Sequence, residues 1–123
     1  MYTKPDPLEK FYGKTIDNFV YDKDHLEFLF SDGEVLTGTA WGDCCSVTWL
    51  ESIDLPGVIS GTLMKIEDIQ MPTPEYDEKA YDCLEFYGIR ITTTNGIAIV
   101  DYRNESNGYY GGYIRWTNRG TRL

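Results

Sequence analysis

The chain contains three cysteines and one histidine. These residue types could form a catalytic thiolate with its base, or a zinc site. Cys44 and Cys45 are adjacent, Cys83 is distant in sequence, and the histidine is His25. A catalytic thiolate needs a base beside it, and His25 is the one histidine that could serve. Structural zinc normally uses ligand pairs spaced by two to four residues, which adjacent cysteines do not supply. We therefore predict no metal, no cofactor and no enzymatic activity.

The segment around the two adjacent cysteines is predicted to be a structural corner with reduced, buried thiols. Asp43 or Ser46 would cap a following helix, and Val47 and Leu50 have helical spacing, so a short helix is predicted over Cys45–Ile53. A redox-sensitive pair of thiols is an alternative for which the sequence offers no specific support.

A second group of reactive side chains lies in residues 103–113, which hold three tyrosines, three glycines and two asparagines. Glycine and asparagine tolerate positive φ, so a sharp turn followed by an aromatic strand is predicted. Aromatic rings and guanidinium groups can together stack a base and hold a phosphate, which makes a nucleotide-binding module one hypothesis. The alternative is that the tyrosines pack on the core. The candidate ligand-binding residues are Arg103, Asn107, Tyr109, Tyr110, Tyr113 and Arg115.

The whole chain has a net charge of −9, and the negative charge is concentrated in its first two-thirds. Residues 1–88 contain 18 Asp and Glu against 6 Lys, whereas residues 89–123 contain 2 Asp and Glu against 5 Arg. A surplus of carboxylates repels phosphate and argues against duplex DNA as a partner, but it attracts a protein with a basic surface. The alternative is that the acidity only keeps the protein soluble. The candidate residues for contact with a protein partner are Glu75, Asp77, Glu78 and Asp82.

The length and composition predict a single globular domain over residues 1–123. With 123 residues, of which 41% are apolar, the chain can bury one sizeable core. It has no apolar run of about 18 residues and no apolar stretch typical of a signal peptide near its N-terminus. We therefore expect a cytoplasmic protein with no membrane partner.

The pattern of apolar residues predicts mainly strands. Short aromatic and β-branched runs at residues 15–21, 25–30 and 34–41 predict a three-stranded meander, and residues 61–71 predict a further strand. Together with the short helix, these elements predict an α+β domain, mainly antiparallel sheet of about six strands.

A hairpin is predicted around Asn95-Gly96, a dipeptide that favours a two-residue type I′ turn. This turn would pair Ile91 with Val100, and Arg90 with Asp101 as a cross-strand ion pair. Because side chains alternate along a strand, one face of the hairpin would be buried. The predicted buried face consists of Ile89, Ile91, Thr93, Ala98, Val100 and Tyr102.

Two motifs, Gly-Asp-Cys-Cys-Ser at 42–46 and Arg-Asn-Glu-Ser-Asn-Gly-Tyr-Tyr-Gly-Gly-Tyr at 103–113, resemble those of a family of small uncharacterised proteins encoded by bacteriophages and bacteria. The resemblance extends over most of the chain and includes Tyr-Gly-Ile-Arg-Ile-Thr-Thr at 87–93, although Glu105 stands where a second serine is expected. It implies a phage context and no assigned mechanism. Small acidic phage proteins are often inhibitors of host systems. The leading hypothesis is therefore an inhibitor of a host anti-phage defence protein, for example of the CRISPR type, acting in the host cytoplasm.

Overall fold

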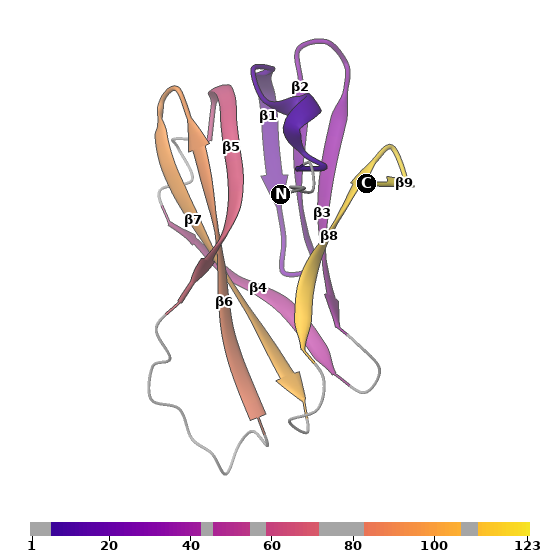
Figure 1. The fold of residues 1–123 in the computed structure, drawn as a ribbon, viewed down its shortest axis with the longest axis vertical. Helices are drawn as coiled ribbons and strands as arrows, with labels where there is room; N and C mark the ends of the chain where they lie inside the picture. Colours follow the sequence, from indigo (N-terminus) through magenta and orange to yellow (C-terminus); the bar gives the residue numbers. More distant parts are fainter. Residues whose placement is uncertain (1–5, 43–45, 55–58, 72–82, 107–110) are drawn as a thin grey trace, which may run out of the picture.

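The computed structural model describes residues 6–42, 46–54, 59–71, 83–106 and 111–123. These described residues form one antiparallel sheet of nine strands in the order β4-β7-β6-β5-β1-β2-β3-β8-β9, preceded by a short 3-10 helix (Figure 1). The elements are η1 Glu9–Phe11, β1 Thr15–Tyr21, β2 His25–Phe30, β3 Val35–Gly42, β4 Val47–Asp54, β5 Gly61–Gln70, β6 Cys83–Thr93, β7 Gly96–Ser106, β8 Gly112–Asn118 and β9 Thr121–Arg122.

The predicted α+β class with about six strands is wrong, because the described residues form nine strands and residues 47–53 of the predicted helix lie in strand β4. A register shift lies between Leu50 and Ser52, which interrupts the alternation of the strand. As a result Leu50 and Ile53 are both buried at a spacing of three residues, the spacing that a helix would also produce. In the described part of the chain, no helix has the length and apolar character needed to cross a membrane.

The predicted meander and the predicted strand over residues 61–71 are confirmed as β1, β2, β3 and β5. β2 shows the pattern most clearly, since Leu26, Phe28 and Phe30 are almost completely buried and alternate with more exposed side chains. Aromatic and β-branched residues fit a half-buried pleated surface, which is why this region was readable from the sequence.

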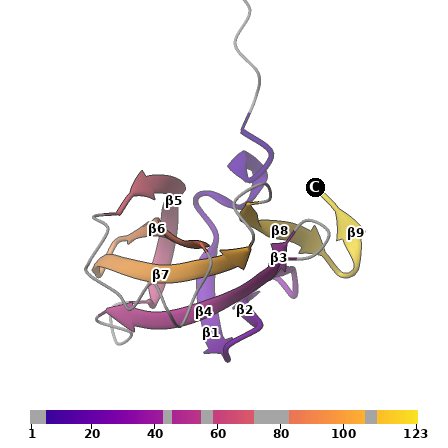
Figure 2. The ribbon, with the colours of Figure 1, turned by 90° about the horizontal axis from the view of Figure 1, so that it is seen from below.

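The sheet folds over so that its two halves face each other (Figures 1 and 2). β5 joins the halves, because it pairs with β6 along most of its length but with β1 only at Gly61 and Thr62. On the other side, the N–H of Leu50 in β4 donates to the carbonyl of Lys23 between β1 and β2, at 2.7 Å. Buried side chains of both halves meet in one core, of which the largest fully buried members are Phe11, Phe28, Phe30, Leu26, Leu36, Leu63, Ile89, Ile91, Val100 and Asn104.

The buried face predicted for the β6–β7 hairpin is confirmed. All six residues assigned to it are at most 6% exposed, whereas Arg90, Thr92 and Ile97 on the other face are more accessible. The alternation of side chains along two long strands therefore identified the core side correctly. The buried residues are Ile89, Ile91, Thr93, Ala98, Val100 and Tyr102.

The predicted register of the hairpin is wrong by two residues, which preserves the faces but changes every partner. The turn residues are Thr94 and Asn95, with Thr93 opposite Gly96. A type I′ turn needs positive φ at both central residues, but here positive φ occurs at Gly96 (138°). The turn is instead held by the start of β5 and the residue before it. The N–H of Thr94 donates to the carbonyl of Thr62 in β5 at 3.0 Å, and Asn95 Nδ2 donates to Ser60 Oγ at 2.7 Å.

The predicted ion pair between Arg90 and Asp101 is also wrong. Arg90 lies opposite Glu67 of β5, and its Nε and one Nη are each 2.6 Å from Glu67 Oε1. Asp101 instead accepts a hydrogen bond from Ser52 of β4 at 3.1 Å. The sequence could not show these contacts, since each partner comes from a distant strand.

Val100→Asp is expected to unfold the domain, whereas Thr92→Asp is expected to lower the free energy of unfolding by less than about 1 kcal/mol. Val100 is fully buried, and a lone buried carboxylate costs several kcal/mol, comparable with the ~5–15 kcal/mol that stabilises a small domain. Thr92 lies on the accessible face. Urea denaturation checks both variants, and a larger loss for Thr92→Asp would contradict the assigned faces.

Candidate functional site

The two sequence motifs converge at one end of the folded sheet. The first motif begins at the end of β3 and the second ends at the start of β8, and these strands pair with Gly42 opposite Gly112. β4 follows the first motif and pairs with β7, which carries the start of the second, so that Thr48 lies opposite Asn104. Figure 1 shows the end of β3, the start of β4, the end of β7 and the start of β8 at the same end of the molecule. This convergence defines the candidate site.

Glycine is required in both motifs because the strands approach closely. A Cβ atom at Gly112 would lie 2.3 Å from Thr48 Oγ1 and 3.0 Å from Asn104 Cβ. A Cβ atom at Gly42 would lie 2.5 Å from Ser46 Oγ. Non-bonded atoms do not approach so closely, so side chains at these positions would force β3 and β8 away from β4.

The centre of the convergence is polar and buried. Asn104 is completely buried, and its Nδ2 donates to Thr48 Oγ1 at 2.9 Å. Its Oδ1 is buried and has no hydrogen-bond partner among the described residues. Thr48 and Ser106 are also buried. A slip of the strands would break this buried hydrogen bond, so the Asn104–Thr48 contact helps to fix β4 against β7.

Sequence reasoning missed this cluster. The second motif was interpreted as a turn, but β7 continues through Ser106, so Asn104 lies in a strand. The central partner, Thr48, was placed on a helix. Asn104 and Ser106 belong to the second motif, which was a signal of their importance, whereas Thr48 lies two residues beyond the first motif.

The Tyr/Arg set predicted for a nucleotide is only partly brought together. Arg115 lies on β8 with its guanidinium 4.0 Å from the centre of the Trp41 ring, and Tyr113 lies opposite Trp41 in the β3–β8 ladder. Arg103 lies on β7, which does not pair with β8. The Arg103 guanidinium is 5.0 Å from the centre of the Phe86 ring. Asn107, Tyr109 and Tyr110 lie outside the described residues.

The remaining candidate residues are placed as follows. The acidic residues Glu75, Asp77, Glu78 and Asp82 lie outside the described residues, as do Cys44 and Cys45. His25 begins β2, and its Nδ1 is 3.1 Å from Asp22 Oδ1.

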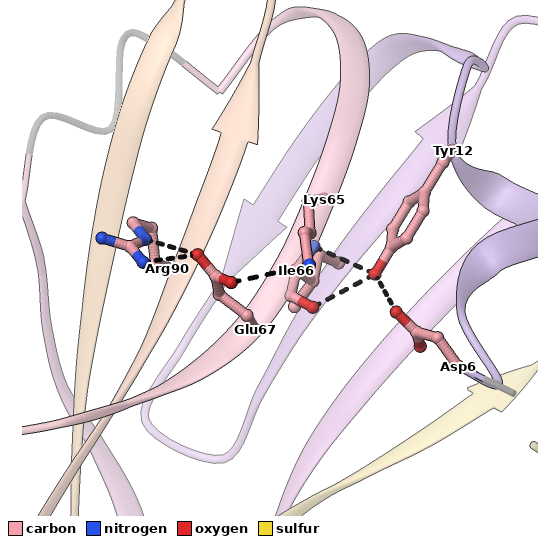
Figure 3. A network of polar contacts seen from close by, with 6 residues as sticks. All are labelled: Asp6, Tyr12, Lys65, Ile66, Glu67 and Arg90. Carbon is pink, nitrogen blue, oxygen red and sulfur yellow. Dashed lines mark hydrogen bonds and ion pairs between the residues drawn. The ribbon is translucent and has the colours of Figure 1, made fainter. Parts of the chain in front are cut away.

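Sequence reasoning also missed a contact between the N-terminal segment and the edge of β5 (Figure 3). The Tyr12 hydroxyl accepts a hydrogen bond from the N–H of Ile66 at 3.1 Å and lies 2.7 Å from Asp6 Oδ2 and 3.1 Å from the Ile66 carbonyl oxygen. Burial, and then the Asp6 carboxylate, raise the pKa of Tyr12 to about 12. A neutral hydroxyl has one proton to donate and can also accept. Protonated Tyr12 therefore accepts from the N–H of Ile66 and donates to Asp6 or to the Ile66 carbonyl, which share its one proton.

Four shallow hollows are lined by described residues, with volumes of about 180 to 340 Å³. Neither Arg103 nor Arg115 lines any of the four. The hollow of about 180 Å³ lies beside the Tyr12 contact and is lined by Asp6, Pro7, Leu8, Ile66, Glu67, Asp68, Ile89 and Trp116.

Gly112→Ala is expected to lower the free energy of unfolding by about 1–3 kcal/mol, since the new methyl group would overlap Thr48. Thr117→Ala on the same strand is the control, because Thr117 lies outside the buried core. Denaturant unfolding measures both. Equal, small effects would contradict the close approach of β4 and β8.

The stability of the domain is expected to fall as pH rises from about 10 to about 12. The folded-state pKa of Tyr12 exceeds its unfolded value of about 10, so its contribution is complete below pH 10 and is lost as the pH rises through the folded pKa. Urea unfolding across this range should show a smaller fall in Tyr12→Phe than in the wild type. Tyr21→Phe, at an exposed tyrosine, is the control and should behave like the wild type.

No curated protein and no solved structure matches the chain. A family model, in contrast, matches residues 9–116. The match extends from η1 through Trp116 of β8 and therefore includes all the strands that form the core and both sequence motifs. The chain thus belongs to the family described as Domain of unknown function (DUF7448).

Proposed function

We propose that this domain is an acidic binding protein, not an enzyme, and that it engages a partner with a basic surface. The observation that carries this proposal is the surplus of carboxylates, with a net charge of −9, on a domain whose arginines are partly engaged internally. Opposite charges on two proteins accelerate their encounter and suppress wrong partners.

The described surface supports the proposal because several carboxylates have no cation beside them while two arginines do have an acidic neighbour. Arg90 pairs with Glu67, and Arg103 Nη1 is 3.5 Å from Glu51 Oε1. Within the described residues, Asp17, Asp24 and Asp68 are exposed and have no lysine or arginine within 4 Å. The acidic residues Glu75, Asp77, Glu78 and Asp82 add to this surplus.

The sequence resemblance to phage-encoded proteins indicates the class of partner. A protein that handles nucleic acid carries basic surfaces, because it must neutralise phosphates. A host defence protein directed against phage nucleic acid, such as a CRISPR component in the host cytoplasm, fits that chemistry. The domain would inhibit such a partner by occupying its basic surface.

A nucleotide-binding module is the second candidate, and one observation favours it. Trp41 is 42% exposed, the Arg115 guanidinium stacks on it, and Tyr113 lies beside it on β8. An exposed aromatic residue next to a cation can stack a base and contact a phosphate. Arg103 lies on β7 and is not part of this group, so the group contains fewer residues than the nucleotide-binding set predicted from the sequence.

A partner captured from a bacterial lysate and identified by mass spectrometry is expected to bind less tightly as salt rises. Replacing Glu75, Asp77 and Glu78 by lysine should slow its association about tenfold or more, because the net charge of a protein acts on association mainly through long-range steering. Stopped-flow kinetics at several salt concentrations measure this effect. Replacing the same residues by glutamine or asparagine is the graded control and should give a smaller change in the same direction.

Arg115→Ala separates the two candidates. It should leave capture of a basic protein unchanged if the acidic surface binds, and it should abolish binding of a nucleotide if the Trp41–Arg115 group binds. Calorimetry against a panel of nucleotides is the second measurement. A tight nucleotide ligand together with no captured protein would contradict the proposed function.

A further inference from the structure

β5 is paired unequally on its two sides. Toward β6 it is paired from Leu63 to Gln70. Toward β1 the pairing is limited to Gly61 and Thr62 and is extended only by two backbone hydrogen bonds at Leu63, to Gly13 and Lys14. Beyond these residues β5 leaves β1, and Tyr12 takes the place of a strand at Ile66 (Figure 3).

The hydrogen bonding of Ile66 shows where the next backbone groups point. In an antiparallel ladder, opposed residues alternate between pairs that bond to each other and pairs whose N–H and C=O groups point outward. Ile66 bonds to Tyr12, so its pair with Ile91 is of the outward kind. Two and four residues further on, Asp68 and Gln70 must then also direct their N–H and C=O groups away from β6.

This segment of β5, Asp68–Gln70, is called the open edge. In the part of the chain that the structure describes, no strand pairs with it on the side away from β6. Unpaired N–H and C=O groups in a row are a template for another extended chain. Native proteins commonly protect such edges with charged side chains, proline or a very short strand. At Asp68–Gln70 the charged side chain is Asp68, whose negative charge repels an acidic segment but attracts a basic one.

The hollow of about 180 Å³ beside Ile66 continues along this edge. Its lining includes Leu8, Ile89 and Trp116, which are apolar, and the carboxylates of Asp6 and Asp68. Asp68 is exposed and has no cation within 4 Å among the described residues. An apolar side chain could enter the hollow while a cationic side chain pairs with Asp68.

We propose that the open edge binds an extended basic segment of the partner protein, which adds to the sheet as a further strand beside β5. Backbone hydrogen bonds to Asp68 and Gln70 supply affinity, the hollow receives an apolar side chain, and a lysine or arginine of the segment pairs with Asp68. The inference rests on the proposed function, because the negative charge of the domain selects the basic segment.

The test uses a short synthetic peptide that repeats Val-Thr-Lys-Thr as the probe, with the intact domain. Side chains alternate along a strand, so its valines and lysines lie on one face, as the hollow and Asp68 do. Amide hydrogen exchange measured by NMR should show that the N–H groups of Asp68 and Gln70 exchange rapidly in the unbound protein and are slowed at least tenfold by the peptide. The N–H groups of Glu67 and Ile69, which bond to β6, should be protected in both states. The same peptide with alternate N–H groups methylated cannot pair along its edge and should lose at least tenfold in affinity.

Gln70→Pro is the matching protein variant. Its N–H faces away from β6, so proline removes no ladder bond but blocks the approach of a strand. The variant should keep its melting temperature within a few degrees of the wild type and lose at least tenfold in affinity for the peptide. Gln70→Ala keeps the N–H and is expected to bind as the wild type does.

Two results with the peptide would overturn the inference. One is equal binding of the methylated and unmethylated peptides, and the other is unchanged exchange at Asp68 and Gln70 when the peptide is bound. The methylated peptide tests the backbone even if Gln70→Pro fails to fold. Salt-sensitive capture of a basic protein that persists in Gln70→Pro would remove the strand addition while leaving the proposed function standing. If the wild-type domain captured no basic protein in a salt-sensitive way, the proposed function itself would be contradicted.

Discussion

The junction between β5 and β1 is the constraint on which the rest of the structure depends. Gly61 adopts a φ of 77°, and a Cβ atom there would lie 2.5 Å from Thr94 Oγ1. Glycine therefore allows the turn of the β6–β7 hairpin to pack against the start of β5 while β5 bends toward β1. This bend lets one sheet cover its own apolar face (Figures 1 and 2). The open edge at Asp68–Gln70 is a direct result of the bend, because a strand that leaves one neighbour early cannot be paired on that side along its whole length.

The parts of the fold that local patterns encode were predictable, and those that depend on distant contacts were not. The meander and the buried face of the hairpin follow from alternation within single strands. β4 was assigned as a helix because a register shift after Leu50 gives two buried residues at helical spacing. The hairpin register was missed because Ser60 and Thr62, more than thirty residues away, hold the turn. The Thr48–Asn104 contact joins residues separated by 56 positions, so no local sequence pattern could predict it.

The candidate binding features combine in a way that bears on self-association. An unpaired strand edge beside an apolar hollow would ordinarily invite a second copy of the same chain. Each copy carries a net charge of −9, so two copies repel one another at the encounter. The same charge attracts a basic segment. Electrostatics would thus distinguish the proposed basic partner from a second copy of the chain, without any change in the shape of the edge.

The pairing of β3 with β8 has a consequence for the order of events during synthesis. Gly42 and Gly112 are opposed in the ladder but are 70 residues apart in the chain. Contacts of such long sequence separation make folding slow, since the entropy of closing the intervening loop is lost before the strand pairing can stabilise the fold. On the ribosome, β3 is made long before β8 emerges, and translation at about 5–20 residues per second leaves its outer edge unpaired for several seconds. The nascent domain therefore passes through a stage in which a chaperone, or the negative charge of its own early residues, must keep that edge from aggregating.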